Sequence, residues 1–152
     1  MSDNPTFIPH IVCSNAAAAI DFYKKAFGAT ETARHLAPNT SKIMHASLNI
    51  NGGVLMLNDD FSDQMKCKPE TPEALGGCPV VLHLQVEDAD AHWAKAIAAG
   101  AKVLMPLADQ FWGDRYGLMS DPFGYKWSIG QSIRKPSAQE LEQAAKAAFA
   151  HS

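Results

Sequence analysis

Two histidines, His10 and His83, are the side chains of this sequence with the clearest capacity for chemistry. Each lies in a short apolar run typical of a β-strand, over residues 7–13 and 80–86. Because the two runs take corresponding places in two similar units, both imidazoles are expected to face one cleft. They could form an acid–base pair, contact a ligand or supply half of a metal site; alternatively, they are hydrogen-bonded structural histidines. His45, in another expected strand, is a third candidate.

An aromatic and charged stretch provides a second set of candidates. Arg115 follows Trp112 and Asp114, and a guanidinium beside an indole can hold a carboxylate or phosphate while the ring stacks on a flat ligand. Alternatively, Asp114 and Arg115 form an ion pair that pins the loop, and Trp112 covers the core. Tyr116 could donate its hydroxyl into the same pocket, and Met56 could supply adaptable apolar lining.

The composition indicates one globular domain with an ordinary core. Of the 152 residues, 47% are hydrophobic and 19% are charged, a balance that excludes a disordered chain. The formal net charge of −3, without a basic cluster, argues against nucleic-acid or anionic-membrane partners. The polar N-terminus does not resemble a signal peptide, and no apolar run reaches membrane-spanning length. Three cysteines without C-x-x-C spacing predict reduced thiols and a cytoplasmic location.

The first half of the chain predicts a strand, a helix and three further strands. Asn15 is a natural N-cap for a helix over residues 16–27, and Gly28 is suited to its C-terminal end. Asn51-Gly52-Gly53 is a tight hairpin signal between the last two strands. The expected strands cover residues 7–13, 29–36, 43–50 and 54–57.

The second half repeats this order after a linker rich in Asp, Lys, Pro and Gly. Asp88 caps a second expected helix at 89–99, and Gly100 follows it as Gly28 follows the first helix. The turn residues Asp121-Pro122-Phe123-Gly124 predict a β-hairpin. The expected strands cover residues 80–86, 102–107, 115–120 and 125–131.

Two such units indicate an α+β fold, a single domain of tandem βαβββ modules at residues 7–58 and 79–131 with a linker at 59–78. Beyond them, the capping box that begins at Ser137 predicts a C-terminal helix within a tail at 136–151. An apolar stripe on this helix would pack on the body or on a second subunit, and a frayed tail is the alternative.

Three motifs resemble the glyoxalase/bleomycin-resistance family of the vicinal oxygen chelate superfamily. They are Ala-Ile-Asp-Phe-Tyr-Lys-Lys-Ala-Phe-Gly-Ala (19–29), Ala-Gly-Ala (99–101) and Asp-Pro-Phe-Gly-Tyr-Lys-Trp (121–127). A fourth, Phe-Trp-Gly-Asp-Arg-Tyr-Gly (111–117), is similar to the PhnB-like, glyoxalase-related branch. The resemblance implies a curved mixed sheet around a cleft, commonly shared between the two chains of a dimer. It does not select a function, because the superfamily holds isomerases, dioxygenases, thiol transferases and binding proteins.

The resemblance also implies where a divalent metal would bind. Metal-dependent members place His or Glu on the first and fourth strands of each module. Those positions fall here on Ile8, Met56, Val81 and Ser128, which offer neither a carboxylate nor an imidazole.

We therefore expect a small-molecule-binding protein of the glyoxalase/bleomycin-resistance type, without the usual divalent metal site and without a cofactor. The alternative is a metal-dependent lyase, isomerase or dioxygenase with a displaced site at His10 and His83, so enzyme activity stays open. A purely structural subunit is a third possibility. The expected partners are a small organic ligand and a second copy in a homodimer. The expected ligand contacts are His10, His83, His45, Trp112, Arg115, Tyr116 and Met56.

Overall fold

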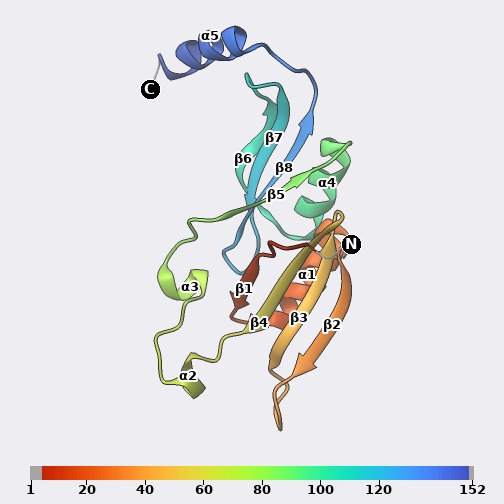
Figure 1. Cartoon of the computed structure of the whole chain (residues 1–152), viewed down its shortest axis with the longest axis vertical. Helices are drawn as coiled ribbons and strands as arrows, with labels where there is room; N and C mark the ends of the chain where they lie inside the picture. Colours follow the sequence, from red (N-terminus) through yellow and green to blue (C-terminus); the bar gives the residue numbers. More distant parts are fainter. Residues whose placement is uncertain (1–4, 151–152) are drawn as a thin grey trace.

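The computed structural model describes residues 5–150 and has the predicted α+β architecture of two βαβββ modules (Figure 1). The strands are β1 His10–Cys13, β2 Thr30–Leu36, β3 Ile43–Ile50, β4 Gly53–Asp59, β5 Val81–Gln85, β6 Lys102–Asp109, β7 Asp114–Ser120 and β8 Lys126–Ser132. The helices are α1 Ala16–Phe27, α2 Ser62–Met65, α3 Pro72–Leu75, α4 Ala89–Ala99 and α5 Ala138–Phe149. None of these helices in the described part of the chain is long and apolar enough to span a membrane.

Each module forms its own four-stranded mixed sheet. The N-terminal sheet has the strand order β1-β4-β3-β2, and the C-terminal sheet has the matching order β5-β8-β7-β6. In both sheets the first strand runs parallel to the fourth, and the other neighbours are antiparallel. His10 lies opposite Met56, and His83 lies opposite Ser128. The two histidines therefore occupy equivalent positions in the two modules.

The helices α1 and α4 end where their capping residues predict. Asn15 and Asp88 each accept a hydrogen bond from the backbone amide three residues later, at 3.0 and 3.1 Å. Gly28 and Gly100 end the helices in the left-handed conformation, with φ of 67° and 118°. Strand β1 is shorter than expected because Pro9 lacks an N–H, although its carbonyl still accepts from the Met56 amide at 3.0 Å.

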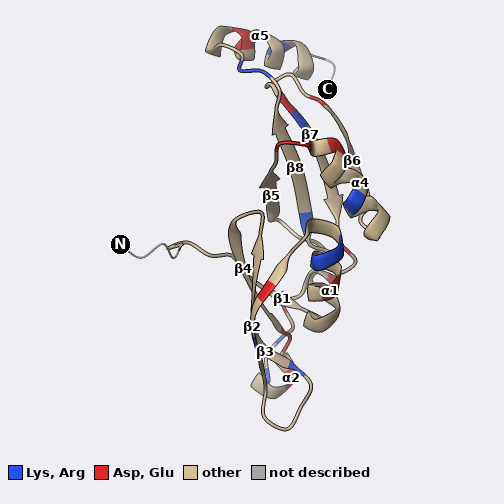
Figure 2. Ribbon diagram, turned by 90° about the vertical axis from the view of Figure 1, so that its right-hand side faces the viewer, with Lys and Arg blue, Asp and Glu red and all other residues tan. Residues whose placement is uncertain are grey.

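Both module helices lie on one side of the sheets and pack against each other, so the opposite face of each sheet is free of helices (Figure 2). Helix α1 buries Tyr23 and Phe27 against Trp127 of β8. The Trp127 ring centroid lies 4.4 Å from that of Phe27 and 5.0 Å from that of Tyr23. Because large rings bury the most apolar surface, this cluster forms a common core for the two modules.

Asp121, in the turn between β7 and β8, connects the modules by hydrogen bonds. Its Oδ2 accepts from the Tyr23 hydroxyl at 2.6 Å and from Trp127 Nε1 at 3.0 Å. Its Oδ1 accepts from the backbone amides of Phe123 and Tyr125, each at 2.9 Å. Desolvation by burial raises the pKa of Asp121, and the donated hydrogen bonds oppose that rise.

Two further links join the modules at β1 and β5, the edge strands of the two sheets. The Tyr125 hydroxyl donates to the Val12 carbonyl at 2.7 Å and accepts from the Val12 amide at 3.2 Å. Asn51 Nδ2 donates to the Gln85 carbonyl at 2.7 Å. Through these bonds each module holds the edge strand of the other.

The linker between the modules contains two short helices, α2 and α3, which the sequence did not indicate. Each spans four residues, too few for a helical periodicity to show. Pro72 of α3 is buried against Gly124, where an added Cβ would lie 2.7 Å from the Pro72 Cβ. The Ser14 hydroxyl donates to Glu73 Oε1 at 3.1 Å. The second half of the linker is thus docked on the body of the protein.

Helix α5 follows the expected capping box and extends beyond the C-terminal sheet (Figure 1). The Glu140 amide donates to Ser137 Oγ at 3.1 Å, and the Ser137 hydroxyl donates to Glu140 Oε1 at 3.3 Å. None of the residues of α5 is buried within the described chain. The helix therefore does not join the core, and its packing on a second subunit stays a prediction.

Candidate functional site

His83 lies flat on the helix-free face of the C-terminal sheet. Its ring reaches from β5 over Gly130 of β8, where an added Cβ would lie 2.8 Å from His83 Cε1. Tyr116 of β7 lies directly opposite Gly130, and its ring stacks with that of His83 at a centroid distance of 5.9 Å. The absence of a side chain at Gly130 therefore lets the imidazole reach Tyr116.

A chain of hydrogen bonds fixes the tautomer of His83. Gln85 Nε2 donates to Ser132 Oγ at 3.1 Å, so Gln85 Oε1 faces His83 Nε2 at 2.8 Å. In the neutral ring Nε2 therefore carries the proton, and Nδ1 accepts from the Ser128 hydroxyl at 2.7 Å. Both nitrogens are satisfied within the protein, so His83 offers its ring face to a ligand and has no free base to offer.

Trp112 extends this aromatic surface. Its ring lies 5.5 Å from that of Tyr116, at an interplanar angle of 71°. The loop that carries it is held by Gly113, whose carbonyl accepts from the backbone amides of Ile133 and Arg134 at 2.9 and 3.1 Å. Gly113 has φ of 103°, and an added Cβ would overlap the Arg134 carbonyl, so this position requires glycine. We call the surface formed by Trp112, Tyr116 and His83 the aromatic platform.

The equivalent face of the N-terminal sheet carries a row of three imidazoles. The ring of His45 lies 6.2 Å from that of His10 and 6.1 Å from that of His35. His10 Nε2 lies 2.6 Å from Asn58 Oδ1. Asn58 Nδ2 donates to the Asp59 carbonyl at 2.7 Å, so Oδ1 is the acceptor and His10 Nε2 is the donor. In the neutral ring, His10 Nδ1 is then an acceptor without a hydrogen-bond partner among residues 5–150.

Arg115 lies on the helix-bearing side of the C-terminal sheet. Its Nε and Nη2 donate to the carboxylate of Asp90, in the first turn of α4, at 3.0 and 2.9 Å. Its Nη1 donates to Asp109 Oδ1 at 2.9 Å. These bonds raise the pKa of Arg115, and the guanidinium in turn lowers the pKa of Asp90. The expected alternative of an ion pair with Asp114 is thus replaced by pairs with two other carboxylates.

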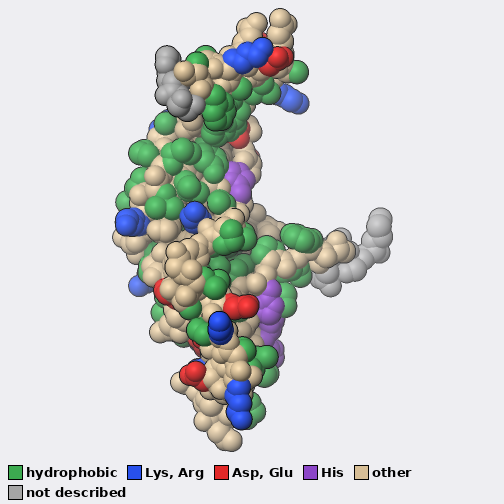
Figure 3. Space-filling view, turned by 90° about the vertical axis from the view of Figure 1, so that its left-hand side faces the viewer, with side chains coloured by type: hydrophobic (Ala, Val, Ile, Leu, Met, Phe, Trp, Pro, Cys, Tyr) green, Lys and Arg blue, Asp and Glu red, His purple; other side chains and the backbone are tan. Residues whose placement is uncertain are grey.

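The seven expected ligand contacts therefore separate into two groups and one isolated residue. The aromatic platform holds Trp112, Tyr116 and His83; the N-terminal sheet holds His10, His45 and Met56; Arg115 joins neither. His10 and His83 bond only within their own modules and line different cavities. Figure 3 shows histidines in two separate patches on one side of the molecule.

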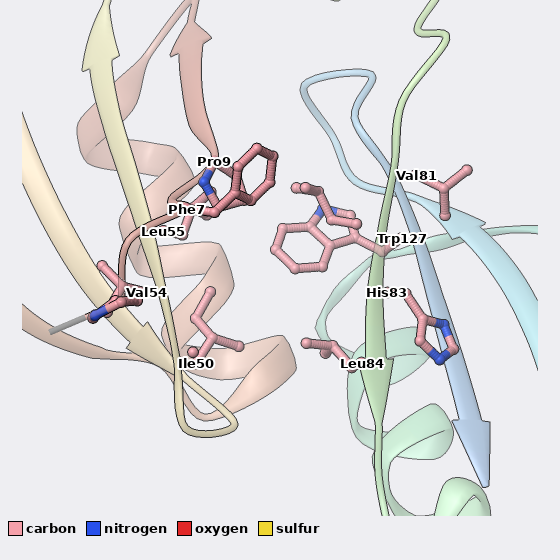
Figure 4. A pocket seen from close by; sticks show the side chains of 12 residues that line it. Phe7, Pro9, Ile50, Val54, Leu55, Val81, His83, Leu84 and Trp127 are labelled. Carbon is pink, nitrogen blue, oxygen red and sulfur yellow. The ribbon is translucent and has the colours of Figure 1, made fainter. Parts of the chain in front are cut away.

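Two cavities lie between the modules. The first has a volume of about 350 Å³, and Ile50 and Leu55 face Leu84 and Trp127 across it (Figure 4). His83, on β5, also belongs to the lining of this cavity. The second cavity, of about 520 Å³, lies under the linker.

The residues at the metal positions implied by the resemblance do not fit a divalent ion. Met56 offers only a thioether, and the Ser128 hydroxyl is bonded to His83. Within residues 5–150, no three His, Cys, Asp or Glu side chains gather closely enough to hold a metal. Burial raises the pKa of the Cys13 thiol to about 12, so this group stays protonated at neutral pH.

Sequence reasoning missed four residues that shape these two faces. Gln85, Gly130 and Asn58 each lie two positions beyond a residue that was considered, so strand alternation could have found them. His35 could not be found in this way, because the pairing of β2 with β3 contains register shifts.

Two tandem βαβββ modules with open, helix-free faces define the class of scaffold. The chain belongs to the Glyoxalase/Bleomycin resistance protein/Dioxygenase superfamily, whose family model matches residues 7–129.

Relatives and solved structures agree with this assignment. The chain is 49% identical over 140 residues to the uncharacterized protein Mb0911c of Mycobacterium bovis, covering 92% of this chain and 91% of that protein. The crystal structure of TioX from Micromonospora sp. ML1 has a TM-score of 0.65 at 25% identity and covers 86% of this chain and 100% of TioX. The X-ray structure of the Arabidopsis thaliana At5g48480 product has a TM-score of 0.62 at 26% identity and covers 85% of this chain and 98% of that one.

Proposed function

We propose that this protein binds a flat aromatic small molecule on the aromatic platform. Trp112 and Tyr116 are half-buried. The Trp112 ring meets the Tyr116 ring edge-on at 5.5 Å, and the Tyr116 ring stacks with that of His83 at 5.9 Å. Each aromatic contact with a ligand would contribute about 1 kcal/mol beyond the burial of apolar area.

The observation that carries the proposal is the pre-arranged ring of His83. Gly130 makes room for the ring, and Ser128 and Gln85 hold its two nitrogens. A surface that is already ordered loses little conformational freedom when a ligand binds. Membership of a superfamily whose proteins bind small molecules supports the same proposal.

We also propose that this binding needs no divalent metal at the family's positions. Met56 and Ser128 lack suitable donors, which supports binding by stacking and hydrogen bonds. Added Zn²⁺, Ni²⁺ or Mn²⁺ should leave ligand affinity unchanged, whereas metal-dependent binding that is lost with His10→Ala or His83→Ala would favour the displaced metal site.

A homodimer is a further part of the proposal. Met44 of β3 and the neighbouring residues Val103 and Leu104 of β6 are 53%, 43% and 44% exposed, and a second chain over them would remove large apolar side chains from water. Light scattering during size-exclusion chromatography should give the mass of two chains, and a monomer at every micromolar concentration would refute this part.

The exposed thiol of Cys67 suits a reducing, cytoplasmic environment.

The experiment that tests the platform is a screen of bicyclic aromatic fragments by saturation-transfer NMR. For a fragment that binds, Trp112→Ala and Tyr116→Ala should each weaken binding about ten-fold. Trp93→Phe is the matched control, because Trp93 packs against Gly117 from α4, on the other side of the sheet. No binding by any fragment, or equal binding by all variants, would refute the proposal.

A further inference from the structure

The cavity under the linker is separate from the aromatic platform. Its volume is about 520 Å³, and none of the three platform residues lines it. Cavities of roughly 300–1,000 Å³ are typical of small-molecule sites. It is therefore large enough for a ligand of its own.

The linker forms a fixed roof over this cavity. Leu75 of α3 and Val80 lie on the roof, and Ile11 of β1 and Leu82 of β5 line the cavity from the two sheets. The roof is anchored where Pro72 packs against Gly124 and where Ser14 bonds Glu73. These contacts hold the linker against the body of the protein, so the cavity is already formed in the folded chain.

Most polar groups in the wall are already paired. The Tyr125 hydroxyl is bonded to Val12, and the Cys78 thiol donates to the Val80 carbonyl at 3.3 Å. Glu70 lies on the exposed part of the linker, and no lysine or arginine lines the cavity in the described chain. An anionic ligand would therefore find a carboxylate and no counter-charge.

Apart from Glu70 on the exposed part of the linker, His10 is the polar side chain in the wall with an unused hydrogen-bonding atom. His10 Nε2–H donates a hydrogen bond to Asn58 Oδ1, which leaves Nδ1 as an acceptor. His10 is exposed in the free protein, so water can reach Nδ1. A ligand that covers Nδ1 without donating to it would displace this water and leave the acceptor unpaired, whereas a ligand with one donor would replace the hydrogen bond.

We propose that this cavity binds an uncharged apolar molecule with a single hydroxyl group, of the phenol class, whose hydroxyl donates to His10 Nδ1. The inference does not rest on the function proposed for the platform.

The test compares two probes by isothermal titration calorimetry, 4-propylphenol and its methyl ether 4-propylanisole. The wild-type protein should bind the phenol about ten-fold more tightly than the ether, because only the phenol can donate. His10→Phe keeps an aromatic ring but removes the acceptor, so the phenol should then bind only as well as the ether. Leu75→Asp should weaken both probes, and Leu75 is 64% exposed, so the change is compatible with folding.

A measurement on the wild-type protein removes the dependence on variants. Binding of the phenol should change the ¹⁵N chemical shift of His10 Nδ1 toward that of a hydrogen-bonded acceptor, and the ether should not change it. Equal affinity for the two probes, or an unchanged Nδ1 signal, would overturn the proposal.

Two controls separate this site from its neighbours. Trp112→Ala should leave phenol binding unchanged, and a loss equal to that of His10→Phe would overturn the proposal by locating the probe on the platform. Size-exclusion chromatography should give the same elution with and without the probe. Dissociation of an oligomer by 4-propylphenol would also overturn the proposal, because side chains of a second copy would then occupy the cavity.

Discussion

The helix-free faces of the two sheets present a histidine from the same position in two different ways. In the C-terminal sheet, Gly130 lets His83 lie flat with both nitrogens bonded. In the N-terminal sheet, Asn58 fills the equivalent position and holds His10 by one nitrogen only. The residue two places further along the fourth strand therefore decides whether the histidine is a stacking surface or a hydrogen-bond acceptor.

The largest expected effect comes from breaking the joint that keeps the two faces side by side. Asp121→Asn replaces one acceptor oxygen by an NH₂ group, which leaves a buried donor of Tyr23 or Trp127 without a partner. Such a loss should lower the free energy of unfolding by about 3 kcal/mol, measured by urea denaturation. Asp109→Asn, at a side chain that is 66% exposed, is the control and should change stability far less. Equal stability of the two variants would show that the hydrogen bonds of Asp121 do not stabilise the contact between the modules.

The same carboxyl predicts a pH dependence of stability. Its pKa is raised in the folded protein, so the protonated form is favoured more by the folded than by the unfolded chain. The contribution of this group is thus complete below the ordinary Asp range and is lost as pH rises through the raised folded value. Urea denaturation across the acidic range should show a stability difference between the wild type and Asp121→Asn that shrinks as the pH rises. A difference that does not change with pH would show that Asp121 does not cause the dependence.

Gly130→Ala should displace His83 from the sheet, because a side chain would then fill the position over which its ring lies, as Asn58 does in the N-terminal sheet. The added methyl group would lie 2.8 Å from the ring, so the ring has to move away from Tyr116. We expect about ten-fold weaker fragment binding on the platform, measured by NMR titration. Gly117→Ala on the helix side is no suitable control, because Trp93 blocks the added methyl group. Gly77→Ala in the linker is the control, because nothing lies within 4 Å of its added Cβ. Unchanged affinity in Gly130→Ala would show that the position of His83 is irrelevant to the ligand.

The reciprocal change, Asn58→Gly, should have a smaller effect. Without Asn58 Oδ1 to accept a hydrogen bond from Nε2–H, the proton of the neutral His10 ring can lie on either nitrogen. The preference for 4-propylphenol over 4-propylanisole should fall about three-fold, measured by calorimetry. Gln85→Ala, which removes the partner of His83 instead, is the control and should retain the preference. If Asn58→Gly discriminates as the wild type does, the tautomer of His10 is set by something else.

Arg115→Lys should have the smallest effect on binding. Its guanidinium is bonded to Asp90 and Asp109 on the helix-bearing side, away from the platform. Fragment affinity should stay within about two-fold of wild type by the same NMR titration. A larger loss of affinity would show that Arg115 contacts the ligand, as the sequence alone predicts.

Sequence alone predicts the features of this protein that are decided locally. Asn15 and Asp88 fix the helix starts through their own side chains, and Gly28 fixes a helix end through its own φ. Residues whose partners are distant in sequence escape such reasoning. Arg115 is held by Asp90, 25 residues away, although Asp114 is its neighbour in the chain.

The candidate site was predictable only in its residue types. Strand alternation puts His10 and His83 on similar faces, and the structure agrees on that point. The hydrogen-bond roles of the two rings depend on Gln85 and Asn58, whose amide orientations follow from further partners. No pattern within one strand carries that information.

The bond between Tyr125 and Val12 has a consequence for aggregation. Strand β1 is at the edge of its sheet, and an edge with unpaired backbone groups can recruit strands from other molecules into fibres. The Tyr125 hydroxyl takes up both the amide and the carbonyl of Val12, so a single phenol does there what a neighbouring strand would do. The same tyrosine that joins the modules therefore occupies this part of the β1 edge, where another chain would otherwise pair.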